Sequence, residues 1–204
     1  MVSIAEVDTE QRPGRPTGAR AAAREQAILD AALSLVMEVG YDRLSMDALA
    51  ERAHAGKATI YRHWSGKAEV VVEAIRRRKC ADLEAPADTG SVRGDLLASL
   101  NHSRESFTEE DSALIVGVLS AMHHDAELAG LMRRQIIEVK QAIFDAIIDR
   151  AVRRGEPVSA GASRVVNEVS SALFFNRVAM GGEPVDEAFV LHVVDDVILP
   201  LLRC

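Results

Sequence analysis

A short segment of the chain, residues 57–63, gathers side chains that can recognise DNA phosphates and the edges of bases. Lys57, Arg62 and His63 supply cations and an imidazole, and Thr59 and Tyr61 supply hydroxyl groups. Such side chains contact phosphate oxygens and also hydrogen-bond base edges in the major groove. Because the segment is short enough for one helix to enter that groove, it predicts a DNA-contacting helix.

The residues around this segment predict two short helices joined by a tight turn. Small or apolar side chains recur at helical spacing over residues 46–53, and Ile60 and Trp64 lie one turn apart in the second helix. Each helix therefore has one face to bury, and the polar side chains remain on the other. The pattern indicates a helix-turn-helix. A further helix over residues 24–39, with an apolar stripe and a stop at Gly40, is expected to brace it.

The spacing resembles the signature of the tetracycline-repressor-like (TetR) family of one-component transcriptional regulators. That signature combines a threonine-apolar-tyrosine core, an aromatic residue three positions after the tyrosine and a lysine shortly beyond it. Thr59, Tyr61, Trp64 and Lys67 reproduce it. The resemblance covers roughly residues 20–70, and the combination of residues is specific.

Two positions depart from the family pattern in the turn. His54 replaces the usual turn glycine, and Gly56 replaces the usual serine before the second helix. Histidine tolerates a positive φ better than most non-glycine residues, and glycine caps a helix almost as well as serine. The turn is therefore expected to form, and one phosphate contact of the family pattern depends on these two positions.

The resemblance implies DNA contacts from the second helix and from its flanks. Lys67 would anchor a phosphate just past the helix, and Ala58 would lie against thymine methyl groups or sugars. Ser45 would either offer its hydroxyl to a phosphate or act as the N-cap of the first helix. The alternative for Tyr61 is a ring that packs inward. The implied DNA-binding set is Ser45, Lys57, Ala58, Thr59, Tyr61, Arg62, His63 and Lys67.

The charge is divided unevenly along the chain. The formal net charge is −7, which by itself argues against DNA binding, but residues 11–80 carry 13 basic against eight acidic side chains. Residues 81–204 carry 11 basic against 20 acidic ones. A basic DNA-facing part is thus attached to an acidic body. The prolines, glycines and arginines of residues 1–19 predict a flexible basic arm, which is either a solvated tail or a segment that follows the DNA backbone.

The sequence indicates a cytoplasmic protein without a membrane partner. It contains no run of 18 or more apolar residues, and residues 1–11 are acidic and lack the apolar stretch of a signal peptide. Only two cysteines occur, Cys80 and Cys204, without the spacing of a metal or redox motif. This usage fits a reducing compartment.

The pattern predicts an all-α protein, because β-branched residues recur at helical intervals and no hairpin signal appears. We expect a helix-turn-helix domain over residues 20–67, a connecting helix over 68–84 and a helical domain for ligand binding and dimerisation over 91–204. A cluster of proline, glycine and polar residues at 85–90 marks the boundary. The expected helices of the body span about residues 92–107, 112–123, 127–154, 162–179 and 186–202.

The last two helices carry more apolar surface than one core can cover. Two such helices from each of two subunits would form a four-helix bundle, which is how the family dimerises. The alternative is a large internal core. The predicted dimer contacts are Val165, Val169, Ala172, Val190, Val194, Val197 and Leu201.

The function predicted from these patterns is a transcriptional regulator, most simply a repressor that a small effector releases from a palindromic operator. Candidate effector contacts are Phe107, Met122, Phe144, Phe174 and Met180, with Arg177 as a polar contact, although apolar residues at helical spacing are more often plain core. The scarcity of aromatics favours an aliphatic or small effector. One alternative is a constitutive DNA-binding protein.

Another alternative is a helical enzyme or metal-binding protein that uses His123, His124 and Asp125. Adjacent residues of a helix point about 100° apart, so this trio is better explained as polar residues at a helix end. No catalytic order of serine, histidine and aspartate, no phosphate loop and no paired cysteines are present. No metal, cofactor or catalytic residue is predicted.

Overall fold

The computed structural model describes residues 18–80, 87–105, 111–181 and 183–202, and within these ranges every regular element is a helix. The head consists of α1 (Gly18–Val39), α2 (Met46–Arg52), α3 (Lys57–His63) and α4 (Lys67–Cys80). The body consists of α5 (Val92–Glu105), α6 (Asp111–Ala121), α7 (Ala126–Met132), the π-helical turn η1 (Arg133–Ile137), α8 (Glu138–Arg153), α9 (Ser163–Phe175), η2 (Asn176–Gly181), α10 (Glu187–His192), η3 (Val193–Ile198) and α11 (Leu199–Leu202). The predicted all-α class is confirmed.

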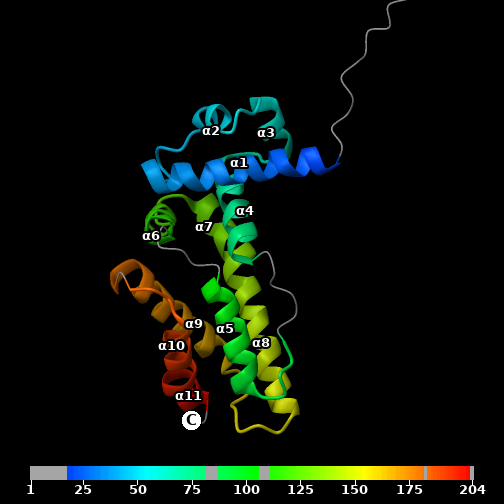
Figure 1. Ribbon diagram of the computed structural model, residues 1–204, viewed down its shortest axis with the longest axis vertical. Helices are drawn as coiled ribbons and strands as arrows, with labels where there is room; N and C mark the ends of the chain where they lie inside the picture. Colours follow the sequence, from blue (N-terminus) through cyan, green and yellow to red (C-terminus); the bar gives the residue numbers. More distant parts are fainter. Residues whose placement is uncertain (1–17, 81–86, 106–110, 182, 203–204) are drawn as a thin grey trace, which may run out of the picture.

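The head is built around α1, which runs across the molecule between the α2–α3 pair and the body (Figure 1). Ile28, Leu29 and Val36 give α1 a continuous apolar face, and they are almost completely buried. The helix ends at Gly40, whose φ of +82° is the left-handed conformation that glycine adopts without a steric penalty. Figure 1 shows α2 and α3 on one side of α1 and α4 leading from α1 into the body.

The body lies below the head, with α5 beside α8 and the three segments α9, α10 and α11 along its other side (Figure 1). The predicted long helix over residues 127–154 is present as α7, η1 and α8 without a break. The π-helical turns differ from the prediction, because each inserts an extra residue per turn and changes which side chains face inward. Of the described helices, none is long and apolar enough to cross a lipid bilayer.

Two hydrophobic clusters form the interior. The head cluster surrounds α1 and α4 and also contains Leu114, Val118, Leu128 and Ile136, which belong to α6, α7 and η1. The body cluster joins α5, α8, α9 and the last helical segments. The packing does not follow the domain boundary predicted at residues 85–90, because side chains of α6 and α7 belong to the hydrophobic cluster of the head.

The buried carboxylate of Asp95 fastens the start of α5 to the end of α8. Its Oδ1 accepts hydrogen bonds from the backbone N–H and the hydroxyl of Thr89, at 2.7 and 2.8 Å, and its Oδ2 lies 3.0 Å from Arg154 and 3.3 Å from Arg150. Burial by itself would raise the pKa of Asp95, but the Thr89 donors and the two guanidinium groups outweigh it and leave the pKa below its ordinary value.

Candidate nucleic-acid interface

The second helix of the helix-turn-helix, α3, divides into a buried and an exposed face. Ile60 is fully buried, and Trp64 at the C-cap is nearly so. The exposed face carries Tyr61 with 52% of its surface accessible, which rules out the inward-packed alternative for its ring. Of the six predicted contacts on α3, Thr59 is half-buried and five are exposed: Lys57, Ala58, Tyr61, Arg62 and His63.

The turn between α2 and α3 tolerates both departures from the family pattern. His54 adopts a φ of +48°, the left-handed conformation in which a glycine was expected. Gly56 is the N-cap of α3 with an extended backbone and no side-chain cap, and its carbonyl accepts from the N–H groups of Thr59 and Ile60. The predicted turn is confirmed.

Ser45 acts as the N-cap of α2. Its hydroxyl oxygen accepts a 3.2 Å hydrogen bond from the N–H of Ala48, so the capping alternative is confirmed. A bidentate ion pair between Arg52 and Glu38, at 2.7 and 2.6 Å, then holds the end of α2 against α1. Together the cap and the ion pair fix the helix that supports α3.

Lys57, at the start of α3, pairs with Asp47 on α2 at 2.7 Å. Both side chains are more than half exposed, so the pair adds little stability and can open when a phosphate competes for the ammonium. Arg62 lies 3.5 Å from the Nε2 atom of His63. Lys57 and Arg62 therefore lie on the exposed face of α3, and their contacts with Asp47 and His63 are open to solvent.

Lys67 has a structural role that the sequence did not reveal. Its ammonium donates to the backbone carbonyls of Tyr41 and Asp42, at 3.2 and 3.3 Å, and lies 4.4 Å from the centroid of the Tyr41 ring. These contacts hold the loop after α1 against the start of α4. An ammonium has three donors, so the two carbonyl bonds leave one proton with which Lys67 could contact a phosphate.

Two of the three residues weighed as a metal site, His124 and Asp125, instead connect the body to the head. The Tyr41 hydroxyl donates to Asp125 at 2.7 Å, while His124 lies 2.8 Å from Asp42. Asp125 also caps α7 by accepting from the N–H of Leu128, and His123 hydrogen-bonds the carbonyl of Leu119. The helix-end interpretation is confirmed, and the described residues contain no group of three possible ligands that could hold a metal ion.

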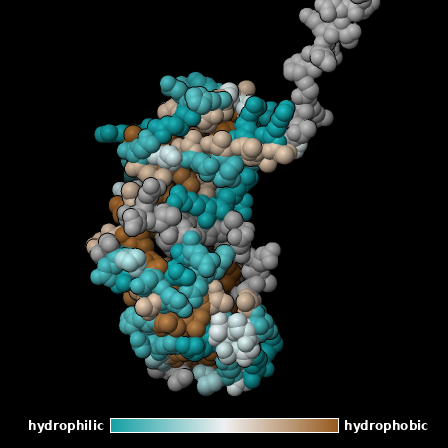
Figure 2. Space-filling model, viewed as in Figure 1, coloured by the Kyte–Doolittle hydropathy of each residue, from teal (hydrophilic) through white to brown (hydrophobic). Residues whose placement is uncertain are grey.

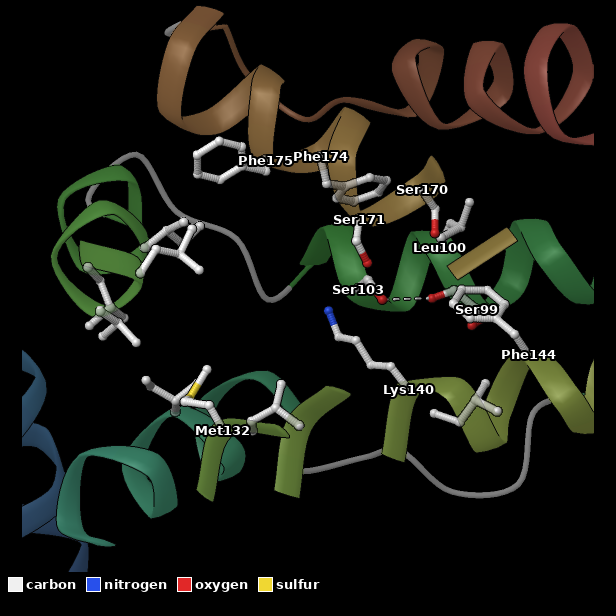
Figure 3. A pocket seen from close by; sticks show the side chains of 17 residues that line it. Ser99, Leu100, Ser103, Met132, Lys140, Phe144, Ser170, Ser171, Phe174 and Phe175 are labelled. Carbon is white, nitrogen blue, oxygen red and sulfur yellow. Dashed lines mark hydrogen bonds between the residues drawn. The ribbon is translucent and has the colours of Figure 1, made fainter. Parts of the chain in front are cut away.

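A cavity of about 290 Å³ lies where the head and body clusters meet (Figure 3). Ile75 of α4 closes it on the head side, and α5, α6, α8 and α9 supply most of the remaining wall. Of the predicted effector contacts, Phe144 and Phe174 line it. Phe107 lies outside the described residues.

Three predicted effector contacts are wrong. Met122 packs against the head cluster. Met180 is 74% exposed. Arg177 is an ion-pair partner of Glu183, lies 4.9 Å from the Phe189 ring centroid and does not line the cavity. Helical periodicity could not reveal the positions of Arg177 and Met180, because η2 changes the facing of residues 176–181, whereas Met122 lies just beyond the end of α6.

The cavity also has lining residues that the sequence did not indicate. They include Lys140 and several serines, which resemble solvated positions when read along their helices. The missed polar residues are Ser99, Ser103, Lys140, Ser170 and Ser171, and Phe175 adds a third phenylalanine to the wall.

The predicted dimer contacts divide into two groups. Val190 and Val194 are fully buried in the body cluster, so their assignment to a subunit interface is wrong: they face the protomer's own helices. Val165 and Leu201 are 44% and 46% exposed. Ala172 is exposed, and Val169 and Val197 are half-buried. Val165, Val169 and Leu201 line a groove between α9 and α11.

Comparison with known proteins yields matches to both parts of the chain. A family model described as "Bacterial regulatory proteins, tetR family" matches residues 28–74, and one described as "Tetracyclin repressor-like, C-terminal domain" matches residues 86–197. The first match covers the helix-turn-helix and the second covers the body.

Relatives and solved structures give a consistent picture. The DNA-binding transcriptional repressor TetR of Mycobacteroides abscessus is 38% identical over 185 residues, which cover 91% of this chain and 97% of the relative. The transcriptional repressor KstR of Mycobacterium tuberculosis is 28% identical over 159 residues, covering 72% and 67% of the two chains. The structure of GusR from Salmonella enterica shares the fold, with a TM-score of 0.68 at 18% identity over 89% of this chain and 96% of the other.

Proposed function

The chain belongs to the TetR family of DNA-binding transcriptional regulators, and we propose that it represses transcription as a homodimer that an effector releases from a palindromic operator. Two relatives, from Mycobacteroides abscessus and Mycobacterium tuberculosis, are named as repressors. The observation that carries the proposal is the two-faced α3, which buries Ile60 and Trp64 and exposes Lys57, Tyr61 and Arg62.

The exposed face of α3 has the composition needed to read a major groove. Cations and hydroxyl groups reach base acceptors and phosphates, and the small side chain of Ala58 allows close approach to the DNA. The face shown in Figure 2 is largely hydrophilic around the helices of the head, whereas hydrophobic patches gather over the body. Lys57, Arg62 and His63 are exposed on α3, so phosphate attraction is concentrated there, and the acidic body lies on the opposite side of α1 (Figure 1).

The surface of α9 and α11 supports the homodimer. Val165, Ala172 and Leu201 leave apolar surface outside the protomer's own core. A second copy that packs its own α9 and α11 on this face would form a four-helix bundle with two-fold symmetry. Two recognition helices related by a two-fold axis read an inverted repeat, so the operator is expected to be palindromic.

The cavity supports release by an effector. Its wall includes Ile75 on α4 and Leu114 and Val118 on α6, and these residues also belong to the head cluster. A ligand that favours a different packing of α4 against α6 would therefore change the position of the head relative to the body. A coupling of about 1–3 kcal/mol is enough to change operator affinity about 5- to 150-fold. A constitutive DNA-binding protein would have the same α3 but no such coupling.

Selection of bound sequences from a random pool of duplex DNA, using the purified full-length protein, tests this proposal. The expected product is one inverted repeat with two equivalent half-sites, bound by one dimer. Enrichment of no common sequence, or of a single unrepeated half-site, would contradict it. A screen of small metabolites for release of the selected operator then separates the repressor with an effector from the constitutive binder.

A further inference from the structure

The cavity between head and body is apolar along most of its wall but polar at one side. Twelve of its 17 lining side chains are aliphatic, aromatic or methionine. The polar ones are Lys140 of α8, Ser99 and Ser103 of α5, and Ser170 and Ser171 of α9. In Figure 3 the Lys140 side chain extends from α8 into the space below Ser103 and Ser171, while the phenylalanines lie around it.

Among the described residues that line this cavity, Lys140 alone carries a charge, and no carboxylate is present. Three of the four serine hydroxyls donate within their helices: Ser103 donates to the carbonyl of Ser99 at 3.1 Å, and Ser170 to that of Val166 at 2.6 Å. Ser171 similarly faces the side-chain oxygen of Asn167 at 3.3 Å. Lys140 is the cationic donor of this wall and its ammonium has three N–H groups, so it forms stronger hydrogen bonds than the serine hydroxyls. An anion gains most from such a donor, because apolar surroundings strengthen charge interactions.

The size and lining of the cavity limit the rest of the ligand. A volume of about 290 Å³ lies at the small end of the usual range for ligand pockets, which suits a single ring or a short chain. Phe144, Phe174 and Phe175 form part of the wall, and Met132 is a further flexible apolar contact. Three of the five phenylalanines of the chain thus surround one site, so an aromatic ring is accommodated as well as an aliphatic chain.

We propose that the effector is a small apolar acid whose carboxylate pairs with Lys140 and whose apolar body lies among the phenylalanines and the side chains of α6. This assignment rests on the proposed function, in that the cavity is taken as the effector site. It names the chemistry that the site selects: an anionic head and a compact apolar body. Matched neutral or cationic molecules lack a partner for the ammonium.

Isothermal titration of the full-length protein with matched probes tests the assignment. One series is 4-phenylbutyrate, 4-phenylbutan-1-ol and 4-phenylbutylamine, and the other is octanoate, octan-1-ol and octylamine. In at least one series the acid is expected to bind about tenfold or more tightly than the alcohol, with the amine weakest, because a charge-assisted hydrogen bond is gained. Lys140→Met should remove this preference while the alcohol binds as before. Arg133→Met is the matched control, because it removes a cation from an exposed position of the same helical run.

The result that would overturn the assignment is equal binding of acid and alcohol in both series, or an acid preference that survives in Lys140→Met. Failure of both acids to bind at millimolar concentration would overturn it as well. Titration of the selected operator in the presence of each probe distinguishes failure of the acid assignment from failure of effector release. Acid binding through Lys140 without loss of operator affinity would refute effector release alone, whereas operator release by the neutral probes without acid preference would refute the assignment of an acid alone.

Discussion

The hydroxyl of Tyr41 donates a 2.7 Å hydrogen bond to Oδ2 of Asp125, across 84 positions of the sequence. Tyr41 follows α1 in the head, and Asp125 is the N-cap of α7 in the body. Burial is the main cause, and this hydrogen bond the second, of a pKa of Tyr41 far above its ordinary value, so the phenol remains a donor. The backbone N–H of Leu128 and then the Tyr41 hydroxyl hold the pKa of Asp125 below its ordinary value, so the acceptor remains a carboxylate. The charge-assisted hydrogen bond between Tyr41 and Asp125 thus joins the loop after α1, which Lys67 also contacts, to α7. The last residue of α7, Met132, lines the cavity.

The two tyrosines of the chain offer a matched pair of substitutions. Tyr41→Phe removes the bond to Asp125 and should lower the free energy of unfolding by about 1–2 kcal/mol. Tyr61→Phe changes an exposed side chain and should leave unfolding within about 0.5 kcal/mol of the wild type while it weakens operator binding. Denaturant unfolding and operator titration of both variants measure these effects. Equal stability losses in the two variants would show that the contact between Tyr41 and Asp125 contributes nothing.

Lys67 should contribute to DNA binding without reading sequence. Lys67→Met removes the ammonium that holds the carbonyls of Tyr41 and Asp42, so we expect about 1–2 kcal/mol lower stability. Loss of a phosphate contact should also weaken binding to all duplexes similarly and reduce the salt slope of log K by about one. Salt-dependent titrations on the operator and on a scrambled duplex measure both. A change confined to the operator would contradict a phosphate role.

Substitutions on α9 and in the last helical segments should separate dimerisation from folding. Val165→Asp and Leu201→Asp place a charge on exposed apolar positions, so each protomer should stay folded while the dimer dissociates and operator affinity falls. Val194→Asp instead buries an unpaired carboxylate in the protomer and should cost on the order of 3 kcal/mol of folding free energy. Sedimentation with circular dichroism distinguishes the outcomes. Unchanged dimers in both exposed variants would contradict the bundle.

Asp95 should give the protein a defined acid sensitivity. Its folded-state pKa lies below that of the unfolded chain, so its stabilisation is fully present above about pH 4–5 and is lost as the pH falls through the folded-state value. Asp95→Asn should cost about 2 kcal/mol at pH 7, because the carboxylate shared by Arg150 and Arg154 is lost while Arg154 keeps its ion pairs with Asp88 and Glu156.

Denaturant unfolding of the wild type and Asp95→Asn at pH 7, 5 and 3.5 measures this contribution. The stability difference between the two should stay constant from pH 7 to 5 and narrow at pH 3.5. Glu168→Gln, which removes an exposed ion pair with Arg164, is the control and should change little at any pH. A difference that widened in acid would contradict the assignment.

The helix-turn-helix could be predicted from the sequence because its signals are local. The apolar faces of α2 and α3, the turn at His54 and the cap at Ser45 all involve residues a few positions apart. The interlock of head and body could not be predicted, since Tyr41 and Asp125 meet only through tertiary packing. Lys67 fits the family motif, but its contacts with the carbonyls of Tyr41 and Asp42 also depend on that packing.

The body was harder to predict, for two physical reasons. An apolar pattern around most of a helix indicates that the helix is covered on two sides, but it does not indicate whether the cover comes from the same protomer or from a second one. Val190 and Val194 face the core of their own protomer. The π-helical turns η1, η2 and η3 change the facing of residues such as Arg177, which a regular helical period misplaces. The scarcity of aromatics also misled, because Phe144, Phe174 and Phe175 are concentrated at one cavity.

The central claim is that the exposed face of α3 reads DNA sequence. The direct measurement is the ratio of dissociation constants for the selected operator and a scrambled duplex, compared between the wild type and a Lys57→Ala, Tyr61→Ala, Arg62→Ala variant. The wild type should show a ratio of about 10³ or more. The triple variant should approach a ratio of one with unchanged thermal stability, whereas Arg133→Ala with Arg153→Ala, which removes the same charge from exposed body positions, should retain the wild-type ratio. A triple variant that kept the wild-type ratio would contradict the claim.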